Sequence, residues 1–230
     1  MVSVKIINKK TINKMKKYTI EGYKYSKFKR FEIINYLIEQ NNYINYLEIG
    51  IGDGECMSQI KIPYKNGVDP NSNYFGVDYK ITSDEFFDLI KGHDIKYDII
   101  FIDGLHITEQ VDKDIQNSLN HLMYNGTIVL HDCNPAEYEL QMPHPFGPYG
   151  GTWNGDVWKS IVKLRHNNSN VKINVVDTDW GCGILQFGNQ ELYNKYPLEK
   201  CLDYYFFDKN REELLNIISV EEFYKLYKKQ

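Results

Sequence analysis

The sequence lacks the features of a membrane-spanning or disulfide-bonded protein. No apolar run of about 18 residues occurs, so no transmembrane helix is expected. The basic N-terminus has neither an apolar segment nor a small-residue cleavage site, unlike a secretory signal. The cysteines Cys56, Cys133, Cys182 and Cys201 include no Cys-x-x-Cys pair, which argues against a zinc ribbon or a disulfide framework. These absences predict a protein of the reducing cytoplasm with no membrane partner.

A strong positive charge is also missing. The formal net charge of −4 does not favour nucleic acid as a partner. One segment differs, because Glu21 is the only acid between Lys5 and Arg30. We expect residues 1–28 to form a basic N-terminal arm, which is either a solvated segment or a contact for an anionic partner.

What the sequence does contain is an alternation of short strands and helices. Strand character occurs at residues 46–49, 67–69, 79–82, 97–103, 126–132, 171–177 and 183–187. Helical spacing of apolar residues occurs at 29–40, 108–124 and 158–165. Apolar strands that alternate with helices predict a parallel sheet covered on both faces. The last two strands are joined by residues 178–182 alone, which is too short for a parallel crossover and predicts an antiparallel hairpin.

A glycine-rich turn follows the first strand. Residues 47–54 read LEIGIGDG, with glycines at Gly50, Gly52 and Gly54. This spacing differs from the G-x-G-x-x-G of dinucleotide-binding proteins. Glu48 would repel a pyrophosphate but attract an ammonium group. The turn therefore favours S-adenosylmethionine as the ligand.

An acid also ends the next strand. Asp69 follows the strand at residues 67–69, where a carboxylate can accept hydrogen bonds from both ribose hydroxyls of a nucleoside. The glycine turn, Glu48 and Asp69 together predict a cofactor site at the carboxyl edge of the sheet.

Four polar side chains follow two other strands: Asp103, His106, His131 and Asp132. Methyl transfer to a hydroxyl requires removal of its proton, and His106 or His131 beside Asp103 is a candidate base. Alternatively, Asp103 and Asp132, with His131, hold Mg²⁺ or another divalent cation. In a third interpretation these groups only cap strand and helix ends.

Between about residues 30 and 187 the chain resembles the class I S-adenosylmethionine-dependent methyltransferases. The resemblance rests on residues 47–54, 67–69, 98–106 and 126–132. The last two motifs are similar to the small O-methyltransferases of glycan and natural-product gene clusters, the methyltransferase domain 24 type.

The resemblance implies a Rossmann-like α/β three-layer sandwich, with a mostly parallel seven-stranded sheet whose last strand is antiparallel. It implies that Asp69 holds the ribose and that Ser83 and Asp84 lie near the adenine, and Asp103 is expected to contact the cofactor too. Several relatives bind a metal through consecutive acids after the later strand, where this chain has His131 and Asp132.

Residues 134–156 form a long stretch rich in proline, glycine and aromatic residues, which predicts a substrate lid or a structural wrap. In a lid, Phe146, Tyr149 and Trp153 could stack on a sugar ring, and His144 could donate a hydrogen bond.

We expect residues 29–190 to form the cofactor-binding domain. Residues 191–230 should form a helical extension that packs on this domain or makes a homo-oligomer contact. The expected activity is methylation of a hydroxyl of a small molecule, a sugar or sugar nucleotide of glycan biosynthesis. The alternatives are another reaction on the same fold and a cofactor-binding module without catalysis.

Overall fold

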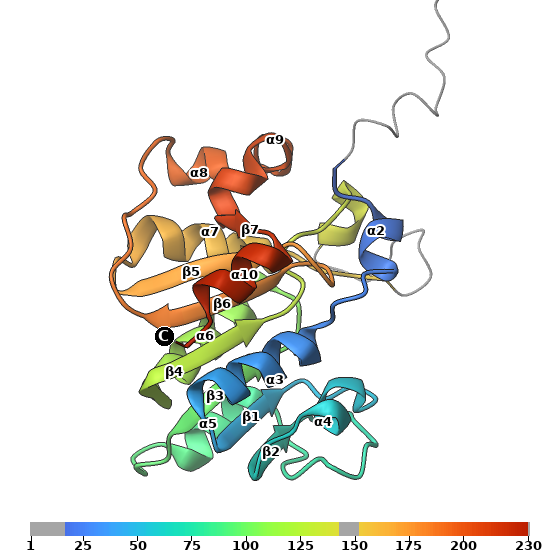
Figure 1. Ribbon diagram of the computed structural model, residues 1–230, viewed down its shortest axis with the longest axis vertical. Coiled ribbons are helices and arrows are strands. Elements are labelled where there is room, and N and C mark those ends of the chain that lie inside the picture. Colours follow the sequence, from blue (N-terminus) through green and yellow to red (C-terminus); the bar gives the residue numbers. More distant parts are fainter. Residues whose placement is uncertain (1–16, 143–151, 230) are drawn as a thin grey trace, which may run out of the picture.

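The computed structural model describes residues 17–142 and 152–229, and a seven-stranded sheet forms its centre (Figure 1). The strand order is β2-β1-β3-β4-β6-β5-β7. The strands are β1 (Asn45–Ile49), β2 (Tyr64–Val68), β3 (Tyr97–Ile102), β4 (Leu122–Leu130), β5 (Val171–Val176), β6 (Cys182–Phe187) and β7 (Ile217–Ile218).

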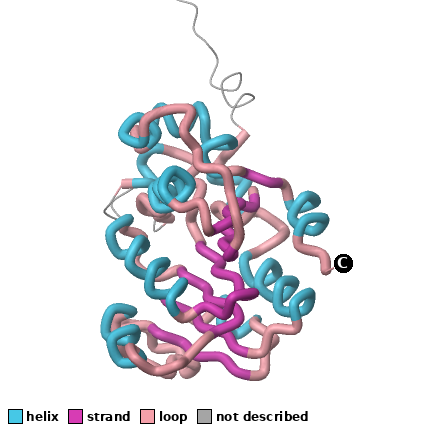
Figure 2. Tube along the Cα trace, turned by 90° about the vertical axis from the view of Figure 1, so that its left-hand side faces the viewer, coloured by secondary structure: helices cyan, strands magenta, loops and turns pink. Residues whose placement is uncertain are grey.

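Helices cover both faces of this sheet (Figure 2). On one face, α5 (Ser83–Ile90), α6 (Thr108–Asn120), α7 (Trp158–Asn167), α8 (Leu198–Cys201) and α9 (Tyr204–Leu215) share a buried apolar cluster with the strands. On the other face, α3 (Arg30–Asn41), α4 (Glu55–Gln59) and α10 (Val220–Leu226) share a second cluster. The remaining short helices are α2 (Ile20–Lys24) and η1 (Tyr138–Gln141). The predicted three-layer α/β sandwich is confirmed.

The predicted mostly parallel sheet is confirmed, and the antiparallel strand in it is β6. Neighbouring strands from β2 to β4 pair in parallel, whereas β6 runs antiparallel to both β4 and β5. The hairpin predicted from the short connection is β5–β6, with Val171 opposite Phe187 and Val176 opposite Cys182.

One expected strand is absent and another is new. Residues 79–82 make a single bridge, Tyr79 with Val68, and no strand. The chain turns there into α5, because Thr82 caps the helix by accepting a hydrogen bond from the backbone N–H of Glu85. The seventh strand is instead β7, which pairs in parallel with β5 and covers the far edge of the sheet.

The ends of the described chain pack on this sandwich. In the C-terminal segment, Phe207 and Leu215 of α9 and Phe223 of α10 are fully buried. Of the expected N-terminal arm, residues 1–16 lie outside the described residues. The remainder contains Tyr23, which is buried and donates a hydrogen bond of 2.8 Å to Asp177.

No helix in the described part of the chain is both long and apolar enough to cross a membrane.

Candidate active site

The glycine turn lies against the end of β3. Gly50 has a φ of +83°, and a Cβ placed on it would come within 2.2 Å of the Asp103 carbonyl oxygen. A side chain at this position would therefore force the two strand ends apart. Because of this close approach, the turn after β1 and the residues after β3 lie directly against each other.

Asp69 ties the same turn to the end of β2. One carboxylate oxygen accepts hydrogen bonds from the backbone N–H groups of Ile51 and Gly52, at 2.9 and 3.0 Å. The other accepts from those of Asn71 and Ser72, at 2.7 and 2.8 Å. Burial opposes ionisation, but these bonds lower the pKa of Asp69. A carboxylate has about four acceptor positions, and backbone groups fill them here, so the ribose contact stays a prediction.

A cavity of about 610 Å³ opens beside the turn, which is within the size range of small-molecule sites. We call it the glycine-turn cavity. Six of the eight predicted cofactor-binding residues line it: Gly50, Gly52, Asp69, Ser83, Asp84 and Asp103.

The other two predicted cofactor residues do not line this cavity. Glu48 is 1% exposed, and its carboxyl group accepts a hydrogen bond of 2.5 Å from the Tyr46 hydroxyl. Burial raises the pKa of Glu48 to about 8, which weakens the argument that its negative charge attracts an ammonium group. Gly54 is the N-cap of α4 and packs against the ring of Tyr74.

A second, smaller pocket of about 320 Å³ adjoins the cavity. We call it the polar pocket. Its lining residues are Arg30, Asp103, His106, His131, Asp132, Thr152, Trp153, Asn154 and Trp180. Asp103 and His106 line both spaces and form the wall they share. A ligand in the cavity and a ligand in the pocket would therefore meet at these two side chains.

The four polar residues predicted at the strand ends do come together. His106 Nε2 and His131 Nδ1 lie 3.2 and 3.1 Å from Asp103 Oδ1. His106 Nδ1 and His131 Nδ1 each lie 3.3 Å from Asp132 Oδ2. These residues lie close together because β3 and β4 are neighbouring parallel strands, whose carboxyl ends are at the same edge of the sheet.

These close pairs shift the ionisation of both histidines. Burial lowers the pKa of His106, but the carboxylates of Asp132 and Asp103 act more strongly together and bring it to about 9. The pKa of His131 is raised well above its ordinary value by Asp103 and Asp132, against burial. Burial also opposes ionisation of Asp103, yet the two imidazoles hold its pKa well below the usual range. The close carboxylates therefore favour the protonated form of both histidines.

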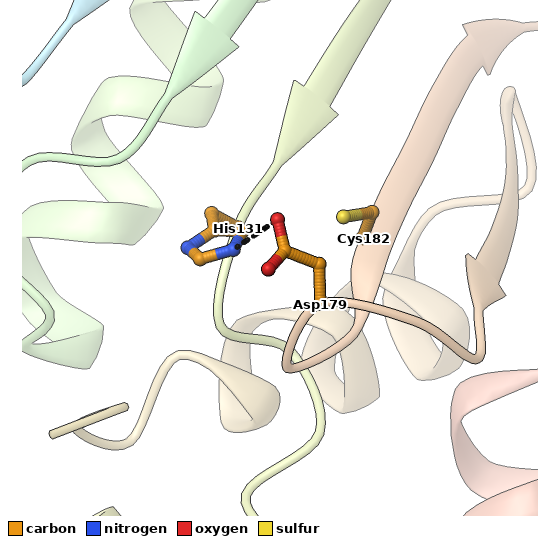
Figure 3. A group of neighbouring side chains, drawn as sticks. All are labelled: His131, Asp179 and Cys182. Atoms are coloured by element: carbon orange, nitrogen blue, oxygen red, sulfur yellow. Dashed lines mark ion pairs between the residues drawn. The ribbon is translucent and has the colours of Figure 1, made fainter. Parts of the chain in front are cut away.

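Sequence reasoning missed Asp179, which approaches His131 from the other side (Figure 3). Its carboxylate lies 3.6 Å from His131 Nε2 and accepts a hydrogen bond of 2.9 Å from the backbone N–H of Arg30. Asp179 and Trp180 have φ values of +44° and +66°, so the turn of the β5–β6 hairpin is held in an uncommon left-handed conformation. A signal was present: β5 is a parallel strand, and the residues after it reach the same sheet edge as Asp103.

Arg30 and Asn154 were missed as well. The Arg30 guanidinium lies 3.2 Å from Asp179, 3.6 Å from Asp103 and 2.6 Å from Glu55. Asn154 donates a hydrogen bond to Asp132. Arg30 begins a helix far away in sequence, and no local pattern indicates its role.

The residues suggested as metal ligands fit a divalent cation in their donor types. Ligand atoms of Asp103, His131 and Asp132 lie within 4.8 Å of one another. Two carboxylates with one imidazole suit a divalent transition metal better than Mg²⁺, which prefers oxygen ligands. The nearby Arg30 and the two imidazoles already balance much of the carboxylate charge, so a cation would compete with protons.

The predicted lid is described only in part. Its residues 143–151, with His144, Phe146 and Tyr149, lie outside the described residues. Trp153 lines the polar pocket, and its backbone carbonyl oxygen lies 3.2 Å from His106 Nδ1.

Comparison with known proteins agrees with this geometry. A family profile described as a methyltransferase domain matches residues 47–133. No curated protein matches the sequence.

Solved structures share the fold at low sequence identity. The O-methyltransferase TomG of Streptomyces achromogenes, involved in tomaymycin synthesis, has a TM-score of 0.51 and 11% identity over 70% of this chain and 80% of that chain. The methyltransferase PaMTH1 of Podospora anserina, bound to S-adenosylhomocysteine, has a TM-score of 0.50 and 12% identity over 82% and 100%. A candidate caffeoyl-CoA O-methyltransferase of Staphylococcus aureus has a TM-score of 0.50 and 19% identity over 69% and 82%.

The strand order and directions are those of the Rossmann-like methyltransferase fold. The profile match over residues 47–133 agrees with the enzyme class that the sequence predicts.

Proposed function

We propose that the enzyme transfers the methyl group of S-adenosylmethionine to a hydroxyl of a small molecule, a sugar or sugar nucleotide. The observation that carries the proposal is the wall of Asp103 and His106, which lines both the glycine-turn cavity and the polar pocket. The cofactor occupies the cavity and the acceptor occupies the pocket. The methyl carbon then lies between them at this wall.

In this proposal His106 removes the acceptor proton. The oxygen forms a bond to the methyl carbon as the carbon–sulfur bond breaks, and S-adenosylhomocysteine leaves with the bonding electrons. His106 is chosen over His131 because it lines both spaces, whereas His131 lines the polar pocket alone. Asp132, held by Asn154, orients the imidazole through Nδ1, and the acceptor hydroxyl gives its proton to Nε2, the nitrogen beside Asp103 at the shared wall.

A divalent cation is the alternative means of activating the acceptor. Asp103, His131 and Asp132 are the residues that would hold it. Such an ion lowers the pKa of a bound hydroxyl. Activity that survives EDTA treatment would count decisively against this alternative.

The lining of the polar pocket supports a polyhydroxylated acceptor. Carboxylates, an amide and a guanidinium provide hydrogen-bond partners, and the rings of Trp153 and Trp180 offer faces on which a sugar could stack. A planar phenolic acceptor would instead favour a largely apolar pocket.

The first experiment is isothermal titration with S-adenosylmethionine, followed by detection of S-adenosylhomocysteine with a panel of sugars, sugar nucleotides and phenols. We expect binding and turnover with the sugar compounds. Absence of binding at millimolar ligand would overturn the proposal. Binding without turnover on any acceptor would favour a non-catalytic module, and turnover of phenols alone would overturn the acceptor class.

The cell compartment and assembly are also proposals. All four cysteines are free and buried, which supports the reducing cytoplasm. A homo-oligomer contact through the C-terminal segment stays a prediction for a measurement of molecular mass in solution.

A further inference from the structure

The β5–β6 hairpin brings a carboxylate and a thiol to one side of His131. Asp179 lies in the turn of this hairpin, and Cys182 is the first residue of β6. Figure 3 shows the three side chains together, and one ligand atom of each lies within 4.8 Å of the others. The exposed fractions are 6% for His131, 2% for Asp179 and 0% for Cys182. We call this group the hairpin trio, and its ligand types are those of zinc sites.

The Nε2 atom of His131 is the least satisfied atom of the trio. It is buried and has no hydrogen-bond partner among the described residues. Asp179 Oδ2 lies 3.6 Å from it, which is beyond ordinary hydrogen-bond length. Two ligand atoms that bind a tetrahedral ion at about 2.0–2.1 Å lie roughly 3.4 Å apart. The separation therefore fits a shared metal ion better than a direct hydrogen bond.

The other ring nitrogen of His131 has the partners that a metal-binding histidine needs. Nδ1 lies 3.1 Å from Asp103 Oδ1 and 3.3 Å from Asp132 Oδ2. A histidine that binds zinc through one nitrogen usually donates its other N–H to a carboxylate, which fixes the ring and makes it a stronger ligand. A cation held by Asp103, His131 and Asp132 would use Nδ1, the nitrogen beside those carboxylates. The hairpin trio presents Nε2, so it is a separate site.

The other two members of the trio have capacity for an ion. The Asp179 carboxylate accepts hydrogen bonds from the Arg30 backbone N–H, the Arg30 guanidinium and Lys29 Nζ. These donors occupy three of the roughly four acceptor positions of a carboxylate. The Cys182 thiol makes a long contact of 3.9 Å with the Thr178 carbonyl oxygen, which is a weak interaction for an S–H group.

Binding of a divalent ion would exchange two protons and leave the charge of the trio unchanged. Against burial, the neighbouring carboxylates favour protonated His131, and burial raises the pKa of Cys182 to about 12. The ion replaces the Nε2 proton and the thiol proton, which pass to solvent. Thiolate and carboxylate then balance the two positive charges of the ion. Arg30 and Lys29 therefore face no added positive charge.

We propose that His131 Nε2, the Asp179 carboxylate and the Cys182 thiolate bind a divalent metal ion of the zinc class. Imidazole and thiolate favour Zn²⁺ or Co²⁺ over Mg²⁺, which prefers oxygen ligands. Three protein ligands leave the fourth tetrahedral position to water. The ion ties the hairpin turn to the end of β4, and the inference does not depend on the proposed acceptor.

The test is a titration of the full-length protein with Co²⁺, after treatment with EDTA and its removal, in a phosphine reductant. We expect one equivalent of Co²⁺ to give the intense near-ultraviolet charge-transfer band of a cobalt–thiolate bond, and Zn²⁺ to displace it. Cys182→Ser should abolish the band. Cys133→Ser is the matched control, because Cys133 is equally buried but belongs to no group of potential metal ligands within the described residues.

Two results in the unmodified protein would overturn the inference. One is the absence of any cobalt spectrum. The other is weak visible bands without charge transfer, which would place the ion at Asp103, His131 and Asp132, a set without cysteine. A charge-transfer band that persists in folded Cys182→Ser, or disappears in folded Cys133→Ser, would assign the thiolate to another cysteine and contradict the site.

Asp179→Asn keeps the test decisive if Cys182→Ser does not fold. Loss of a direct ligand should weaken Co²⁺ binding by about 10- to 100-fold or more, since even a change in a group that only orients a ligand typically costs that much. Circular dichroism checks the fold of each variant. Unchanged Co²⁺ affinity in a folded Asp179→Asn would remove the carboxylate from the site and refute the inference.

Discussion

The glycine-turn cavity and the polar pocket share a wall but are built in different ways. The cavity is lined by residues 49–114, within one stretch of chain, and much of its shape comes from backbone. The pocket collects side chains from five separate segments, around Arg30, Asp103, Asp132, Trp153 and Trp180. Local sequence therefore specifies the glycine-turn cavity, and packing of distant elements specifies the polar pocket.

The largest effect is expected at His106, in the wall that the glycine-turn cavity shares with the polar pocket. His106→Gln should lower kcat by about 10²- to 10⁴-fold, because the proposed base is lost, and should leave S-adenosylhomocysteine affinity within a few-fold. The rate of product formation gives kcat, and isothermal titration gives the affinity for S-adenosylhomocysteine. His93→Gln, an exposed histidine, is the control. A His106→Gln enzyme with normal kcat would show that the base lies elsewhere.

On the cofactor side, Gly50→Ala tests the backbone contact. The new Cβ would lie 2.2 Å from the Asp103 carbonyl oxygen, so we expect S-adenosylhomocysteine to bind about 100-fold more weakly. Gly52→Ala is the matched control, since its φ is also positive but its Cβ meets nothing within 4 Å. Equal losses in both variants would mean that backbone conformation, and not the close approach, controls binding.

The pH dependence of turnover tests the charge on the acceptor side. With a pKa of about 9, His106 is protonated at neutral pH, and the fraction able to act as a base grows as pH rises. In EDTA-treated enzyme at saturating cofactor, kcat should rise nearly tenfold per pH unit from 6 to 8 and level above about 9. A profile already flat at pH 7 would contradict the assignment.

Asp179→Asn tests whether the hairpin turn positions His131 and Arg30. We expect kcat to fall by about 10- to 100-fold, with cofactor affinity unchanged, because the cluster loses a buried charge. Asp88→Asn, a surface change on α5, should have no effect. Restoration of kcat by Asp179→Glu would support positioning, whereas an equal loss of cofactor affinity would point to general unfolding.

The smallest effect on binding is expected for Glu48→Gln. The folded protein holds a proton on Glu48 up to about pH 8, whereas the unfolded chain loses it near 4.5, so the native residue costs stability as pH rises. The variant should gain about 4 kcal/mol in the free energy of unfolding at pH 8 and nothing at pH 4. Denaturant titration measures this gain. A large loss of cofactor affinity would show that Glu48 attracts the ammonium group after all.

The pattern of strands and glycines was sufficient for the fold class, because each strand run and the glycine turn are local properties of the chain. The prediction of a strand at residues 79–82 was wrong for a local reason, because Thr82 and Glu85 form a capping box that begins α5 there. Ile217 and Ile218 were missed as a strand because two residues carry no periodicity of their own.

By itself, the sequence determined much of the glycine-turn cavity and its shared wall: the glycine turn, Asp69 after the next strand, and the polar residues that end β3 and β4. Parallel strands bring such ends to one edge, so order along the chain predicts nearness there. Only the tertiary structure decided that Glu48 is buried and that Asp179, Arg30 and Asn154 complete the polar cluster. Their roles depend on which elements pack together and on which carboxylates share a buried space, and no short stretch of sequence records either.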